Sequence, residues 1–233
     1  MRKAFNKWAS NTIRRQRGTL STPWQRAVGW FELYFVDHAF FRSIYLNRHY
    51  VTPDFLRSAQ PSPGHIKKLA RDGVKTIINL RGERNCSSYL WEKQWCEELG
   101  ITLINFQVRS RDVPQKQVIQ DAKDLFDRVE KPVLVHCKSG ADRAGFMAAL
   151  YLVLEGRSVE EALKQLSPAY GHIRQGKTGI LDYFFETYEV HRQETGEDFL
   201  TWIKGPYDSK ATRAAFKSSW WANVLVDRIL RRE

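Results

Sequence analysis

A cysteine and an arginine with five residues between them stand where an apolar run meets a helix-forming run. Cys137 ends the run that begins at Val133, and Arg143 opens the apolar stretch that continues to about residue 155. A strand, a short loop containing Gly140 and a helix would place the thiol among backbone N–H groups at a helix start. Such groups bind phosphate-like anions. The same partial positive charge favours the thiolate, which is a nucleophile.

The spacing alone is a weak signal, and its context gives it weight. Neither of the other two cysteines, Cys86 and Cys96, has an arginine six positions later. Only Cys137 lies between a β-branched run and a helical run, so that Arg143 could bind two phosphate oxygens bidentately. The alternative is a buried cysteine that precedes an ordinary helix.

This segment resembles the His-Cys-x5-Arg signature of the cysteine-dependent protein tyrosine and dual-specificity phosphatase superfamily. Residues 57–61 and 76–81 are similar to the opening strands of its compact, atypical dual-specificity-like members of bacterial type. The resemblance covers about residues 51–195. It implies a three-layer α/β fold with a central, mostly parallel sheet flanked by helices. It also implies a phosphocysteine intermediate and no metal or other cofactor.

The resemblance assigns roles within the signature. Cys137 is expected to attack phosphorus, while Arg143 and the loop amides stabilise the equatorial oxygens. His136 is expected to orient the loop or tune the thiolate, and a core histidine bonded to the backbone is compatible with that role. The loop residues expected to bind the phosphate are Lys138, Ser139, Gly140 and Ala141.

Two aspartates compete as the general acid that protonates the leaving oxygen. Asp112 lies in a polar loop 25 residues before Cys137, where the family carries a mobile acid loop, but it could instead cap a turn or helix. Asp142 directly precedes Arg143. A helix start and a neighbouring arginine favour its charged form, which opposes an acid role until substrate binds. We favour Asp142, because the loop fixes its position.

The residue after the signature arginine departs from the family pattern. The family usually has Ser or Thr there to stabilise the departing thiolate, and this chain has Ala144. Breakdown of a phosphocysteine is therefore expected to be slow unless Ser139 supplies a hydroxyl. This keeps open a phosphate-binding module with little catalysis. Sulfur transfer or arsenate reduction on a similar loop is a weaker third alternative.

The 233 residues carry 37 Lys and Arg against 26 Asp and Glu, a net charge of +11. Most of the excess lies at the two ends, so we divide the chain into a basic aromatic extension (1–50), a phosphatase domain (51–205) and a basic amphipathic helix (206–233). Three widely spaced cysteines favour a reducing, cytoplasmic compartment. The ends are expected to pack on the domain or to bind the anionic inner face of a membrane. Nucleic acid is not favoured, and the oligomeric state is not predicted.

Hydrophobic periodicity and glycine stops predict alternating strands and helices. The strands are expected at 51–57, 74–80, 101–108 and 133–136, and the main helices at 24–41, 65–72, 88–99, 115–130, 144–155, 179–195 and 220–232. His172, Arg174 and Lys177 precede the helix at 179–195 and are expected to contact the substrate beyond its phosphate, or else to form a solvated connection. The resemblance implies a phosphoprotein substrate, with a phospholipid or phosphorylated glycolipid headgroup as a close second expectation and a soluble polyphosphorylated metabolite as the third.

Overall fold

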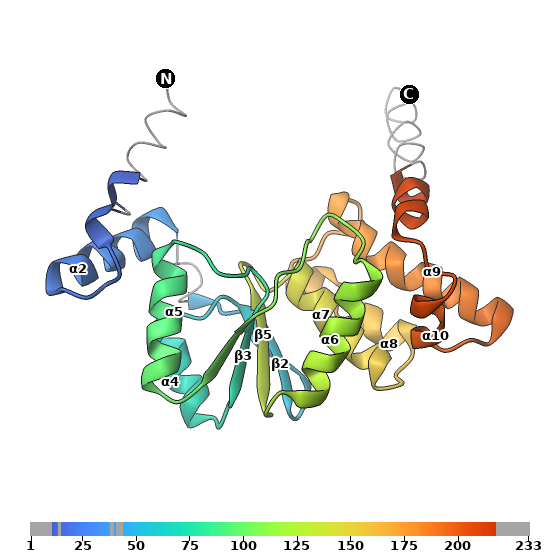
Figure 1. Ribbon diagram of the computed structural model, residues 1–233, viewed down its shortest axis with the longest axis horizontal. Helices are drawn as coiled ribbons and strands as arrows, with labels where there is room; N and C mark the ends of the chain where they lie inside the picture. Colours follow the sequence, from blue (N-terminus) through green and yellow to red (C-terminus); the bar gives the residue numbers. More distant parts are fainter. Residues whose placement is uncertain (1–10, 14, 38–39, 41–43, 218–233) are drawn as a thin grey trace, which may run out of the picture. The chain divides into compact units, whose positions relative to one another are not determined.

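The computed structural model describes residues 11–13, 15–37, 40 and 44–217 (Figure 1). The chain divides into two compact units. The first, called the sheet unit here, comprises residues 1–107 and 130–140; the second, the helical unit, comprises residues 108–129 and 141–233. The predicted phosphatase domain at residues 51–205, with an extension on either side, stays a prediction.

A five-stranded sheet forms the centre of the sheet unit. Its strands are β1 (His49–Thr52), β2 (Phe55–Ala59), β3 (Thr76–Asn79), β4 (Thr102–Asn105) and β5 (Val133–Cys137). The order is β1-β2-β5-β3-β4, and every neighbouring pair is parallel except β1 with β2. β5 is the middle strand, and its last residue, Cys137, lies opposite Ala59 of β2. The predicted α/β class with a mostly parallel sheet is confirmed.

The first predicted strand, 51–57, is in fact a hairpin. β1 and β2 run antiparallel, and a tight turn at Pro53 and Asp54 joins them. Proline has no N–H to donate to a strand ladder, and the hydroxyl of Thr52 donates to the Asp54 carboxylate at 2.6 Å. These two local preferences interrupt the apolar run that the sequence pattern reads as one strand.

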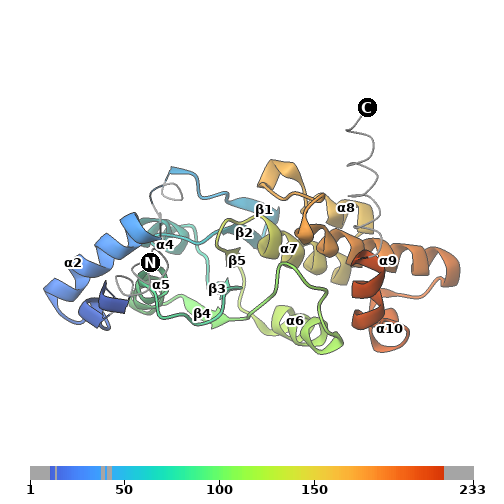
Figure 2. The ribbon, with the colours of Figure 1, turned by 90° about the horizontal axis from the view of Figure 1, so that it is seen from above.

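Two helices of the sheet unit pack on the sheet. α4 (Pro63–Arg71) and α5 (Ser87–Glu98) lie side by side along it (Figures 1 and 2). The core between these helices and the sheet includes Leu56, Ile66, Leu69, Ile77 and Leu134. A fully buried side chain of this size stabilises the fold by roughly 1.5–3 kcal/mol.

The helix predicted from residue 24 is α2 (Pro23–Phe31), continued by a π-helical turn, η1 (Glu32–Val36). The Thr22 hydroxyl caps this helix by accepting from the Gln25 backbone N–H, and Pro23 lies in its first turn. The Trp30 ring packs against Trp91 of α5 at a tilted angle with ring centroids 5.0 Å apart, so one aromatic face of α2 packs on α5. Other large apolar side chains are exposed: Trp24, Phe31, Phe35 and Phe40. The membrane contact stays a prediction.

The helical unit contains α6 (Lys116–Arg128), α7 (Asp142–Leu154), α8 (Val159–Leu163), α9 (Ile180–Thr195) and α10 (Phe199–Lys204), with 3-10 turns η2 (Pro168–Tyr170) and η3 (Lys177–Gly179). An aromatic cluster around Phe184 joins α7, α9 and α10. The sequence pattern missed α10, which the Asp198 carboxylate caps. Residues 209–217 are helical, and the helix predicted at 220–232 lies outside the described residues. No helix within the described ranges is long and apolar enough to cross a membrane.

Candidate active site

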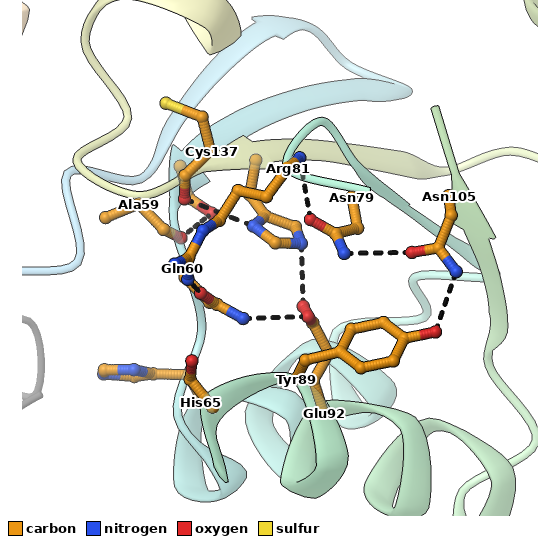
Figure 3. A network of polar contacts seen from close by, with 12 residues as sticks. Ala59, Gln60, His65, Asn79, Arg81, Tyr89, Glu92, Asn105 and Cys137 are labelled. Carbon is orange, nitrogen blue, oxygen red and sulfur yellow. Dashed lines mark hydrogen bonds and ion pairs between the residues drawn. The ribbon is translucent and has the colours of Figure 1, made fainter. Parts of the chain in front are cut away.

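Cys137 stands at the carboxyl end of the central strand. Its side chain is only 2% exposed, and the cysteine is free, as are Cys86 and Cys96. In Figure 3 its sulfur points away from the polar network that lies under the strand end. Burial and the nearby Glu92 raise the pKa of the Cys96 thiol to about 12, so that thiol is inert near neutral pH. Position therefore distinguishes Cys137 as the candidate nucleophile.

The loop after Cys137 is tied back through its carbonyl oxygens. The carbonyl of Lys138 accepts from the Gln60 backbone N–H at 3.4 Å, and that of Ser139 accepts from the Asn47 amide at 3.0 Å. The carbonyl of Gly140 accepts from the Arg57 guanidinium at 2.6 Å. In a trans peptide each C=O points opposite to the following N–H. The next three amides are therefore turned away from these anchors, as an anion-binding loop requires.

Only glycine fits at position 140, because of the backbone conformation there and because of the space available for a side chain. Its φ of +77° lies in the left-handed region. A Cβ at this position would lie 2.6 Å from the backbone nitrogen of Ala59 and 3.0 Å from the Asn47 amide nitrogen. Any side chain here would push the loop off β2.

A buried polar network supports the strand end from below (Figure 3). His136 Nε2 lies 2.7 Å from the Glu92 carboxylate, and both side chains have no exposed surface. The other Glu92 oxygen accepts from the Gln60 amide at 3.0 Å, and the Arg81 guanidinium donates to the Gln60 amide oxygen. His136 is thus held from α5, which fixes the residue directly before the thiol.

The network continues along the carboxyl ends of β3 and β4. Asn79 Nδ2 donates to the Asn105 amide oxygen at 2.9 Å, and Asn105 Nδ2 donates to the Tyr89 hydroxyl at 2.8 Å. The Asn79 amide oxygen accepts from the backbone N–H of Arg81. These contacts connect the carboxyl ends of β3 and β4 to α5.

In the helical unit, Asp142 and His172 lie together. His172 has no exposed surface; its Nδ1 is 2.8 Å from an Asp142 oxygen and its Nε2 is 2.7 Å from an Asp182 oxygen. Burial lowers the pKa of His172, but hydrogen bonds and charge from the two carboxylates outweigh burial and raise the pKa to about 9. The imidazolium therefore bridges the start of α7 and the first turn of α9. Both ring nitrogens of His172 face carboxylates, so His172 holds Asp142 in place, and a contact between His172 and substrate stays a prediction.

The raised pKa of His172 predicts a pH-dependent stability. A group whose pKa is higher in the folded state, about 9, than in the unfolded chain, 6.5, stabilises the fold fully below 6.5. That contribution is lost as the pH rises through 9. We expect the difference in unfolding free energy between the wild type and His172→Gln to shrink over this range, as measured by urea denaturation at several pH values. A difference that is constant from about pH 6 to pH 10 would contradict the bridge.

Asp112, the other acid candidate, is bound by ion pairs. Its carboxylate lies 2.5 Å from the Arg213 guanidinium and 3.6 Å from that of Arg109. The Tyr207 hydroxyl donates to the carbonyl of Pro114 in the same loop at 2.6 Å. The segment that follows α10 therefore holds this loop, and Asp112 stays the second acid candidate.

Other residues predicted for the site lie in the first turn of α7 or form ion pairs. Arg143 is in the first turn of α7 and is partly buried, and Ala144 after it has no exposed surface. Arg174 forms an ion pair with Glu186 at 2.6 Å. Lys138 Nζ lies 3.4 Å from Asp37 Oδ1, so these side chains form an ion pair.

Sequence reasoning missed most of the supporting residues, among them Arg57, Gln60 and Glu92. Arg57 and Gln60 belong to the segment that carries the family resemblance, and a buried arginine in a strand is a signal that could have found one of them. Glu92 gives no such signal, because it precedes the signature by more than 40 residues and lies on a helix with charged neighbours.

A family model described as "DSP-PTPase phosphatase fused to NAD+ Kinase" matches residues 45–178, which is more than half of the chain. The chain belongs to this dual-specificity-like phosphatase family. The match includes the signature loop, Asp112 and His172 but not α9, α10 or the segment that contains Arg213.

Curated relatives agree with this family. The dual-specificity protein phosphatase TpbA of Pseudomonas aeruginosa is 26% identical over 52% of this chain and 53% of its own length. The human phosphatidylglycerophosphatase and protein-tyrosine phosphatase 1 is 27% identical over 64% of this chain and 78% of its own length. The chain thus spans about half the length of the TpbA proteins that it matches.

Solved structures of dual-specificity-like phosphatases are also similar. The crystal structure of P. aeruginosa TpbA is 22% identical with a TM-score of 0.49, covering 73% of this chain and 90% of that one. A TpbA variant in complex with pTyr is 21% identical, with the same TM-score and coverage. The structure of PTPMT1 is 20% identical with a TM-score of 0.45, covering 64% of this chain and 99% of that one.

Proposed function

We propose that the protein hydrolyses phosphate monoesters through a phosphocysteine intermediate on Cys137, without a metal ion. The observation that carries the proposal is the loop from Lys138 to Gly140, whose carbonyls are tied to the scaffold so that the following amides are turned the other way. Membership of the dual-specificity-like phosphatase family supports the same reaction.

The chemistry proceeds in two steps. The Cys137 thiolate attacks phosphorus in line, an S–P bond forms and the P–O bond to the leaving group breaks. Water then attacks the phosphocysteine, which releases inorganic phosphate and returns the thiolate. Arg143 and the loop amides bind the equatorial oxygens in both transition states, where electrostatic stabilisation supplies most of the rate enhancement.

The Asp142–His172 pair is the proposed source of the proton for the leaving oxygen. His172 lies 2.8 Å from Asp142 and holds a proton up to about pH 9, because burial, which lowers its pKa, is outweighed by hydrogen bonds to its two carboxylate partners, which raise it. Transfer of that proton through Asp142 to the leaving oxygen leaves His172 neutral, and the attacking water returns a proton in the second step. Asp182 keeps the imidazole oriented.

Asp142→Asn is expected to separate substrates by leaving group. Alkyl phosphates need a proton on the leaving oxygen, so their kcat/KM should fall by roughly 10²–10³-fold. Phenolic phosphates with good leaving groups should lose only a few-fold. The measurement is steady-state hydrolysis of a matched alkyl and aryl series. Asp112→Asn is the matched control, because it removes the other carboxylate.

The outcomes of this comparison are distinct. Equal losses on both substrate types in Asp142→Asn would end the acid role of Asp142. A leaving-group dependence found in Asp112→Asn alone would transfer that role to Asp112.

Turnover is proposed to be limited by the second step. Ala144 offers no hydroxyl to the departing thiolate, and its side chain is buried without exposed surface. Rapid phosphocysteine formation with slow hydrolysis follows. In the extreme, the protein binds phosphorylated ligands with little catalysis, which is the second candidate function that Ala144 supports.

A phosphoprotein is the first proposed substrate, because the TpbA relatives are named dual-specificity protein phosphatases. A phospholipid or phosphorylated glycolipid headgroup is the second, supported by the name of the human relative and by the exposed aromatic side chains of α2 and η1. A panel of phosphopeptides and lipid phosphates, compared by kcat/KM, distinguishes the two classes.

A further inference from the structure

A cavity of about 480 Å³ lies within the helical unit. Three segments form it: the loop before α6, the turn η3 with the start of α9, and the helix at 209–217. Its lining residues are Arg111, Asp112, Lys177, Ile180, Arg213, Phe216 and Lys217. A cavity of this volume is large enough for a small organic molecule.

The lining is strongly basic. It holds four cationic side chains and one carboxylate, and that carboxylate, Asp112, is already paired with Arg213. Within the part of the chain that the structure describes, Arg111, Lys177 and Lys217 form no ion pair. Several cations without counter-charges around one cavity attract an anion, and concave walls strengthen that attraction.

One wall of the cavity is apolar. Ile180 is buried, and Phe216 packs against Tyr183 of α9 with ring centroids 5.7 Å apart. This contact holds the Phe216 ring, which lines the same cavity as the cationic side chains. The wall therefore offers contact area to a hydrocarbon or ring, which a free inorganic anion does not need.

We propose that this cavity is a second binding site, specific for a carboxylate or phosphate group carried on an apolar or aromatic body. Most of the lining, including Arg213, Phe216 and Lys217, lies beyond the family match at 45–178, so the site is a property of this chain's C-terminal segment. The ligand is either a second acidic group of the substrate or a separate organic anion.

The first arm measures binding without turnover. Naphthalene-2,6-dicarboxylate, a fluorescent dianion without phosphate, is titrated into the full chain carrying Cys137→Ser. Adding Lys217→Glu places a negative charge in the cavity and should weaken binding by roughly tenfold or more. Lys210→Glu, an exposed position outside the lining on the same helix, is the matched control and should leave affinity unchanged.

The second arm identifies the source of the acidic group through inhibition of phenyl phosphate hydrolysis by the same dicarboxylate. Competitive inhibition assigns the cavity to a second acidic group of the substrate, and non-competitive inhibition assigns it to a separate anion. Inhibition of either type by the dicarboxylate should be lost in Lys217→Glu.

Absent binding, or equal binding by Lys217→Glu and Lys210→Glu, would overturn the proposal. A different result would contradict the proposed phosphatase activity alone: phenyl phosphate is not hydrolysed, but dicarboxylate binding still depends on Lys217.

Discussion

Replacing Cys137 by serine is expected to lower phosphate release from phenyl phosphate by about 10³-fold or more. A serine hydroxyl is protonated near neutral pH and is a far weaker nucleophile than a thiolate, so the covalent step is lost. The substitution changes one atom in a side chain that is 2% exposed, and the fold should be retained. The measurement is steady-state phosphate release with a metal chelator present throughout.

Cys86→Ser is the control for this substitution. Cys86 is a free, partly exposed cysteine that precedes α5, and its replacement should leave activity within a few-fold of the wild type. Wild-type turnover in Cys137→Ser would remove Cys137 from the mechanism.

Glu92→Ala is expected to destabilise the protein by about 3 kcal/mol. Glu92 has no exposed surface and is the partner of both His136 and the Gln60 amide. Removing the carboxylate leaves the buried His136 ring nitrogen and the Gln60 amide without their acceptor, and each unsatisfied buried donor costs roughly 1–3 kcal/mol. Urea denaturation of the wild type and the variant measures the difference.

Two further variants make this test specific. Glu97→Ala lies on the exposed face of the same helix and should change stability by less than about 0.5 kcal/mol. Glu92→Gln keeps the shape and one acceptor oxygen, so its loss should fall between the other two. Equal stabilities of Glu92→Ala and Glu97→Ala would show that the buried contact to His136 contributes nothing.

Most elements of the fold could be predicted, because their signals are local. Gly73 and Gly100 end helices at positive φ, and the apolar run from Val133 forms the central strand as expected. The hairpin in the first predicted strand could not be foreseen from apolar composition, since the turn depends on Pro53 and on the hydrogen bond from Thr52 to Asp54. The short helix α10 was hidden because six residues are too few to show a period.

The candidate site was predictable only where its residues are contiguous. Cys137 and its loop share one motif, whereas Glu92 reaches His136 through sheet and helix packing that spacing does not encode. His172 illustrates the opposite error: a basic residue in a polar segment suggests a surface role, but the fold buries it between two carboxylates. The pairing of Asp112 with Arg213 joins residues about 100 positions apart, and no sequence pattern connects them.

The central claim is that phosphate passes through Cys137. The most direct test mixes the enzyme with an aryl phosphate, stops the reaction with a denaturing quench after a few milliseconds, and finds the phosphorylated peptide by mass spectrometry. The account predicts one phosphoryl group on the peptide containing Cys137, accumulating in a burst because Ala144 offers no hydroxyl to assist its breakdown. Turnover with the phosphoryl group on another residue, or on none at any time, would contradict it.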